Sequence, residues 1–224
     1  MTINSEKIID EVLDEEMKHT VPEARKLLYF MIDPDQIKRS SETYKHLFFE
    51  MYPLLYVAER LENVKWIKFS GAHKKYDGII KFQDNPSQQR IEFVRALDIE
   101  QEIIKNQLEK MLNTPSGLKV EEGNSFVYNK KQQFKIMKTM KWLWRKAYTK
   151  KLAKNNKTGQ YEGVWLGIVF DDTMLPPSSY GRIEKRAKNI WRKYGKRAVN
   201  PFQRVFLIGL SGKFIFDTQS TSVP

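Results

Sequence analysis

The sequence predicts an α/β protein with one mixed central sheet flanked by helices. Three observations lead to this fold class. Apolar residues recur at helical spacing over residues 4–18 and 42–62, short β-rich segments follow between residues 64 and 97, and residues 164–170 form a near-continuous apolar run of strand length. With 224 residues, of which 41% are hydrophobic, residues 1–224 can form a single domain with a substantial core.

The first 40 residues are predicted to form an N-terminal helical arm. Residues 4–18 place their apolar side chains on one side of a helix. A second helix is expected to begin near Thr20, because Glu23 follows it at the spacing of a capping box. Residues 42–62 predict a longer helix, which Pro53 should kink or break.

Three short strands are expected next, over Val64–Ser70, Tyr76–Phe82 and Arg90–Leu97. Turn-forming residues separate them, which favours an antiparallel meander. Helical periodicity returns over Asp98–Leu112, and residues 113–129 are typical of a loop.

The second half of the chain alternates helices and strands. A basic helix is predicted over Lys130–Ala153, and a helix near 181–194 follows a buried strand. The three strands of this half are expected at Val164–Phe170, Phe202–Leu210 and Lys213–Phe216, the last two forming a hairpin. The basic helices thus fall within residues 130–197. Asp171 and Asp172 end the first of these strands, where aspartates usually form turns.

Composition excludes several functional classes. Cys is absent, which excludes disulfide scaffolds, thiolate nucleophiles and Cys-based zinc sites. Three His residues are few for a His-rich metal site. We therefore expect any metal to be a hard cation bound by oxygen. No apolar run reaches the roughly 18 residues of a membrane span, and the acidic N-terminus lacks a secretory signal. We therefore expect a cytoplasmic protein with no membrane partner.

The charge is distributed unevenly between the two halves. Residues 1–122 carry 18 basic and 22 acidic side chains, a net charge of −4, whereas residues 123–224 carry 21 basic and 5 acidic side chains, a net charge of +16. Such asymmetry indicates a polyanionic partner, and nucleic acid is the commonest one. The alternative is a set of solvated helix faces that only keep the protein in solution.

Two carboxylates occur within otherwise apolar strands. Asp77 shares a sheet face with Ile79 and Lys81, and Glu92 shares a face with Val94. If their strands pair as a hairpin, both carboxylates can converge, and a divalent cation would relieve their repulsion. The alternative is that Asp77 starts a strand and Glu92 pairs with a neighbouring arginine.

The order of these elements resembles the PD-(D/E)XK superfamily, which has the restriction-endonuclease-like fold. The resemblance covers residues 42–170: a helix, a three-stranded meander with Asp77 in its second strand and Glu92 in its third, a helix and a further buried strand. It implies that Asp77 and Glu92 bind Mg²⁺ or Mn²⁺, with a third carboxylate from the preceding helix. Glu50 is the candidate for that helical carboxylate, and Glu59 is the alternative.

The motif departs from the family at its lysine, where this chain has Val94. The resemblance then requires another residue to orient the attacking water. Lys81, which shares the face of Asp77, is the first candidate, and Lys75 and Gln101 are the others. The lysine-free motif also favours an alternative in which the protein is a non-catalytic nucleic-acid-binding module.

Cations of the second half are expected to bind the phosphate backbone with little base specificity. The residues that we select for this contact are Lys135, Lys138, Arg145, Lys150, Arg182, Arg186, Arg192 and Lys193. Trp142 lies among lysines off the apolar stripe, where it can stack on a base or pack on a neighbour.

The leading hypothesis is a metal-dependent nuclease that acts on DNA in preference to RNA. A non-catalytic binding module is the second hypothesis, and a structural or protein-interaction domain without nucleic-acid affinity is the third. The sequence leaves open whether the chain forms a homodimer.

Overall fold

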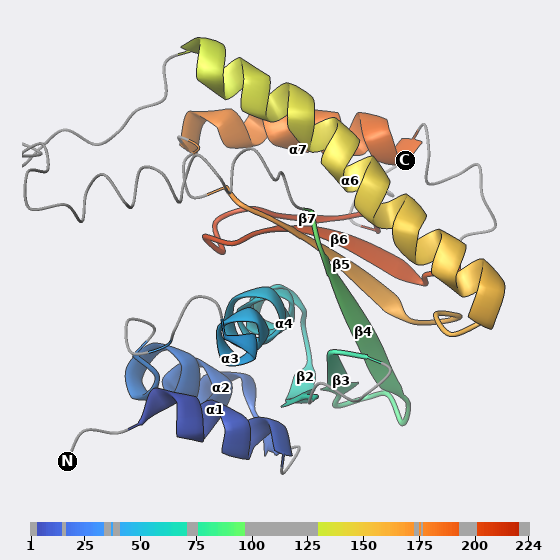
Figure 1. Ribbon diagram of the computed structural model, residues 1–224. Coiled ribbons are helices and arrows are strands. Elements are labelled where there is room, and N and C mark those ends of the chain that lie inside the picture. Colours follow the sequence, from blue (N-terminus) through green and yellow to red (C-terminus); the bar gives the residue numbers. More distant parts are fainter. Residues whose placement is uncertain are drawn as a thin grey trace, which may run out of the picture.

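The computed structural model describes residues 4–14, 17–33, 37, 41–70, 76–96, 130–172, 175, 177–192 and 201–219, without the side chains of residues 130–141, 177 and 190. Over this part of the chain, the predicted fold class is confirmed. The protein is α/β, with a mixed seven-stranded sheet that has helices on both faces (Figure 1). The helix and loop expected over residues 98–129 lie outside the described residues. None of the described helices is both long and apolar enough to cross a bilayer.

The sheet keeps its strands in chain order. They are β1 (Lys18–His19), β2 (Val64–Phe69), β3 (Gly78–Phe82), β4 (Gln88–Arg95), β5 (Trp165–Phe170), β6 (Arg204–Gly209) and β7 (Ile215–Asp217). The predicted meander is confirmed, because β2, β3 and β4 are successively antiparallel. In contrast, β4, β5 and β6 are parallel, and β7 returns antiparallel to β6. The sequence did not predict β1, a two-residue strand that pairs with β2.

Helices of the N-terminal part cover one face of the sheet, drawn in blue below it in Figure 1. They are α1 (Ser5–Asp14), α2 (Val21–Lys26), η1 (Leu27–Met31), α3 (Glu42–His46), η3 (Leu47–Met51) and α4 (Tyr52–Arg60). The expected capping box is present, since Glu23 accepts the backbone N–H of Thr20 at 2.7 Å. Pro53 lies in the first turn of α4, and the π-helical turn η3 interrupts the α-helix just before it.

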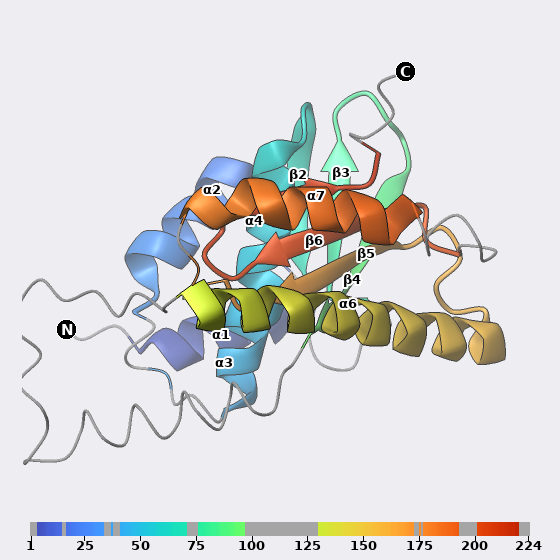
Figure 2. The same cartoon turned by 90° about the horizontal axis from the view of Figure 1, so that it is seen from above.

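The opposite face is covered by the two basic helices, α6 (Lys130–Thr158) and α7 (Tyr180–Ile190), the latter preceded by the 3₁₀ turn η4 (Pro177–Ser179). Both views show them side by side across the sheet (Figures 1 and 2). α6 lies between β4 and β5 in the chain, and α7 lies between β5 and β6. Parallel neighbours require such crossover connections.

Two cores lie on the two faces of the sheet. In β4, Ile91 and Phe93 pack against the N-terminal helices, whereas Val94, and Ala96 just after the strand, pack on the side of α6 and α7. Successive side chains of a strand point to opposite faces. Glu92 therefore points to the α6 side, into an otherwise apolar layer.

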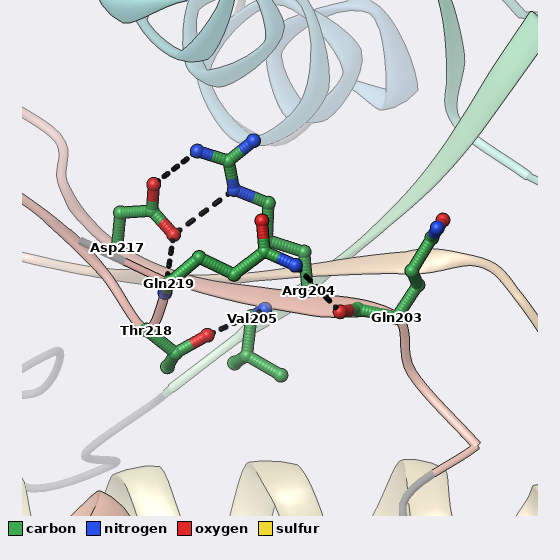
Figure 3. A network of polar contacts seen from close by, with 6 residues as sticks. All are labelled: Gln203, Arg204, Val205, Asp217, Thr218 and Gln219. Atoms are coloured by element: carbon green, nitrogen blue, oxygen red, sulfur yellow. Dashed lines mark hydrogen bonds and ion pairs between the residues drawn. The ribbon is translucent and has the colours of Figure 1, made fainter. Parts of the chain in front are cut away.

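A polar network secures the last strand at one edge of the sheet (Figure 3). The Nε of Arg204 lies 3.0 Å from the Oδ1 of Asp217, and its guanidinium carbon lies 5.0 Å from the ring centroid of Trp165. On the other face, the hydroxyl of Thr218 accepts the backbone N–H of Val205 at 3.1 Å. These contacts join β6 to β7 from both sides, so we assign this network a structural role.

Candidate functional site

The predicted carboxylates, Asp77 and Glu92, lie near the point where two strands separate, and the charge of Glu92 acts on Asp77. The pairing of β3 with β4 ends at Gly78 and Ile91, and beyond that point β4 continues beside β5. Asp77 is the residue just before β3. Its backbone N–H donates to the carbonyl of Ile91 at 3.0 Å, and its Oδ2 accepts the backbone N–H of Phe93 at 2.5 Å. The Asp77 carboxylate thus binds β4 at the residue that follows Glu92.

Glu92 is buried, with 8% of its surface exposed, and two side chains bind it. The ammonium of Lys151, from α6, forms an ion pair with its Oε1. The hydroxyl of Tyr161, a fully buried residue, donates to the same oxygen at 3.3 Å. A buried carboxylate requires such partners, because an uncompensated charge in this layer would be strongly unfavourable.

The electrostatics of the two carboxylates differ. Burial raises the pKa of Asp77 well above its ordinary value, and the negative charges of Glu92 and Glu50 raise that pKa further. The N–H of Phe93 and the charge of Lys151 act in the opposite direction but do not outweigh them. Without an added cation, Asp77 therefore keeps its proton to a higher pH than an ordinary aspartate.

Lys151 is a cation in this environment. Burial alone would lower the pKa of its ammonium, but the charge and hydrogen bond of Glu92 outweigh burial, so the pKa lies above its ordinary value. Lys151 therefore donates hydrogen bonds and supplies positive charge near neutral pH, and it is not suited to act as a base.

Of the two candidate helical carboxylates, Glu50 is the one whose charge reaches Asp77. It lies in η3, and its Oε2 is 2.6 Å from the Nδ1 of His46. The hydrogen bond to Glu50 raises the pKa of His46, although burial opposes this. Glu59 instead accepts a hydrogen bond from the Nε of Arg25 at 2.8 Å, which joins α4 to α2.

Lys81, the predicted substitute for the motif lysine, is not brought to this site. It pairs with Gln88 at the far end of β3, and its ammonium donates to the carbonyl of Pro86 in the β3–β4 turn. Lys81 lies four positions further along the strand than Asp77, a distance of roughly 13 Å along the backbone. The other candidates, Lys75 and Gln101, lie outside the described residues.

Lys151 is the residue that sequence reasoning missed, although a signal was present. It follows Trp144 by seven residues and Ala147 by four, so it continues the stripe with which α6 packs against the sheet. A lysine at a core-facing position of an amphipathic helix requires a buried anion, and Glu92 supplies it.

The predicted backbone-binding cations lie on the two helices that cover this face. Arg145 and Lys150 on α6, Arg182 on α7 and Arg192 beyond it are exposed, and Arg186 is half-buried. Lys135 and Lys138 belong to α6, but their side chains lie outside the description, as does all of Lys193.

A metal at this site would have few protein ligands. Within the described ranges, no group of three or more His, Asp or Glu side chains is arranged to hold a metal ion. The pair Asp77 and Glu92 still fits Mg²⁺, which commonly takes one or two carboxylates and fills its remaining positions with water and phosphate oxygens. Burial and the charges of Glu92 and Glu50 raise the pKa of Asp77, and a bound cation would act against both causes.

Comparison with known proteins gives no relative: no model of a protein family, no curated protein and no solved structure matches this chain. Any function proposed for the site therefore depends on its residues and their geometry.

Proposed function

We propose that the protein is a metal-dependent nuclease of the PD-(D/E)XK type, which hydrolyses phosphodiester bonds of nucleic acid, DNA in preference to RNA. The observation that carries this proposal is the place of Asp77 and Glu92 where β3 and β4 separate, with Asp77 bound to the residue next to Glu92, the charge of Glu50 acting on Asp77 and the ammonium of Lys151 paired with Glu92.

The strand arrangement supports the same proposal. A helical segment carrying Glu50 precedes the antiparallel β2–β3–β4 meander, Asp77 adjoins the second strand, and Glu92 lies in the third. The next strand, β5, is parallel to β4. This order of elements is the one on which the resemblance to the restriction-endonuclease-like fold depends.

In the proposed mechanism, Asp77 and Glu92 hold Mg²⁺ or Mn²⁺, and Glu50 adds negative charge beside them. The bound ion supplies a Lewis acid that stabilises charge on the phosphodiester and lowers the pKa of a water molecule. Tyr161 orients the carboxylate of Glu92 through its hydroxyl. Lys151 takes the role of the motif lysine, because it is the described cation that contacts Glu92 from the α6 side.

The exposed cations of α6 and α7 would hold the substrate. Phosphate contacts from lysine and arginine provide affinity and position without reading sequence, so we propose little base specificity. A cytoplasmic location remains a prediction, and whether the chain forms a homodimer stays open.

A non-catalytic nucleic-acid-binding module is the second candidate. It is favoured by the ion pair that already neutralises Glu92, and by Val94 at the lysine position of the motif. In this case the Lys151–Glu92 pair would only stabilise the packing of α6 on the sheet.

A cleavage assay on labelled DNA and RNA in EDTA, Mg²⁺ and Mn²⁺ tests the proposal. We expect metal-dependent cutting that falls by about 10³-fold in Glu92→Gln, which removes a metal ligand. Lys151→Met should lower the rate by about 10²-fold, the usual loss on removing one positioned donor.

Lys81→Met is the control, since Lys81 is the lysine that the sequence predicted for this role but it binds the β3–β4 turn instead of Glu92. It should cut at the wild-type rate. Salt-dependent binding without cutting would instead establish the binding module. Loss of cutting in Lys81→Met but not in Lys151→Met would contradict the role of Lys151.

A further inference from the structure

The outer face of α6 carries a hollow of about 400 Å³. The described part of its wall is formed by Trp142, Arg145, Lys146, Thr149, Lys150 and Ala153. These residues recur at intervals of three and four, so they form one stripe along the helix. The stripe with which α6 packs on the sheet, through Trp144 and Ala147, lies on the opposite side. We call the outer stripe and its hollow the α6 groove.

Trp142 distinguishes this groove from an ordinary solvated helix face. Its side chain is 58% exposed, whereas its neighbour Trp144 is 2% exposed. Large aromatic side chains are usually buried, because each carries much apolar surface. The sequence left open whether Trp142 packs on a neighbour; in the structure Lys146 lies over its ring, and more than half of the residue's surface is open to solvent.

The surroundings of Trp142 favour an anionic ligand. The ammonium of Lys146 lies 4.8 Å from the centroid of the indole ring, and Lys150 is exposed one turn further along. The sequence has no acidic residue between Glu122 and Glu162. A flat aromatic ring beside several cations is complementary to a nucleotide, whose base stacks while its phosphate pairs with ammonium groups.

Stacking also indicates which form of nucleic acid fits. The bases of a duplex stack on each other, so an exposed indole on a convex helix reaches only an unpaired base. We propose that the α6 groove binds single-stranded nucleic acid, with one base on Trp142 and the adjoining phosphates on Lys146 and Lys150. The strand would be the substrate of the proposed nuclease, so its biological role rests on that function, whereas the binding itself does not need the carboxylates.

Fluorescence anisotropy in EDTA tests the groove, because cleavage is then suppressed. The probes are labelled oligo(dT), oligo(rU) and an oligo(dT)·oligo(dA) duplex. We expect Trp142→Ala to weaken binding of the single strands about tenfold, as loss of one base–aromatic stack does. Trp142→Phe keeps an aromatic ring and should restore most of the affinity. The duplex should respond much less, and the two single strands distinguish DNA from RNA.

Phe30→Ala is the control, since Phe30 is 80% exposed but lies on the N-terminal helices. It should bind oligo(dT) as the wild type does. Three outcomes would each contradict single-strand binding by the α6 groove. These are equal losses of affinity for single strands and duplex in Trp142→Ala, unchanged affinity in Trp142→Ala, and no binding by the wild type. Binding that depends on Trp142 in a protein that cuts nothing with Mg²⁺ would overturn the nuclease and leave the groove standing.

Discussion

Two aspartates at strand ends, the half-buried Asp77 and the buried Asp172, differ in the partners of their carboxylates. Asp77 lies just before β3 and Asp172 just after β5, and burial is the main cause that raises the pKa of each. Their surroundings differ. Asp172 is almost fully buried and accepts three hydrogen bonds from neutral donors, with the charge of Asp171 acting on it. In the described part of the chain, Asp77 accepts one hydrogen bond, and the charges of Glu92 and Glu50 act on it.

Asp172 has the partners that a structural carboxylate needs. It accepts the backbone N–H of Ser211 at 2.8 Å, the Ser211 hydroxyl at 2.6 Å and the Tyr180 hydroxyl at 3.3 Å. Gly209 lies so close that a Cβ there would overlap the carboxylate. Asp172 thus joins the end of β5 to the β6–β7 turn, and the sequence-based prediction of a turn aspartate agrees with its carbonyl accepting Leu175 N–H at 2.9 Å.

Asp77 lacks comparable compensation. Its carboxylate accepts the N–H of Phe93, and the charge of Lys151 also favours its ionisation, but burial and the charges of Glu92 and Glu50 outweigh both. The difference teaches that burial by itself does not mark a functional carboxylate. What marks Asp77 as a candidate is the negative charge of Glu92 and Glu50 that acts on it, which a bound cation would offset.

The largest effect on stability should come from Asp172. Asp172→Ala leaves three part-buried donors without their acceptor and removes a buried side chain, and we expect the free energy of unfolding to fall by about 3 kcal/mol. Urea denaturation followed by circular dichroism measures this loss. A loss well under about 1 kcal/mol would mean that water replaces the carboxylate, and the contrast with Asp77 would then disappear.

Asp77→Asn, in contrast, should stabilise the folded protein at neutral and higher pH. The folded protein keeps a proton on Asp77 that the unfolded chain releases above about pH 3.9. Wild-type stability therefore decreases as the pH rises from that value through the raised folded-state pKa, while the amide has no such decrease. We expect the variant to be more stable by about 1 kcal/mol at pH 8 in EDTA.

Thermal unfolding of both proteins from pH 4 to pH 8 measures this difference, which should grow with pH. Asp172 titrates in both proteins, so its own contribution cancels. A variant that is less stable than the wild type throughout would show that Asp77 is compensated as Asp172 is, which would remove the main reason for regarding it as a site.

The smallest effect is expected for Tyr161→Phe. Its hydroxyl donates a long hydrogen bond to Glu92, whereas its ring, near Lys151 and Lys154, is retained. We expect a loss of about 0.5 kcal/mol in the free energy of unfolding, at the low end for a hydrogen bond. Urea denaturation beside Tyr148→Phe, a second tyrosine of the α6 side, provides the comparison. A loss as large as that of Asp172→Ala would mean that Glu92 depends on Tyr161 more than on Lys151.

Most elements could be predicted from local patterns. The capping residues of α2, the meander and the buried strand β5 each have a signature within a few residues, because capping and strand periodicity are short-range properties. Asp77 and Glu92 were identified because a carboxylate inside an apolar strand is unusual. Lys81 was selected by the same alternation, which correctly groups residues on a face but does not limit their distance along it.

The sequence by itself determined the α/β class, the helical and strand segments, the two strand carboxylates and the basic second half. Only the tertiary structure decided the parallel pairing of β4 with β5 and β6, and the identity of the cation beside Glu92. Both depend on contacts between residues far apart in the chain, such as Glu92 and Lys151. Such contacts follow from how α6 packs across the sheet, which no local pattern of residues specifies.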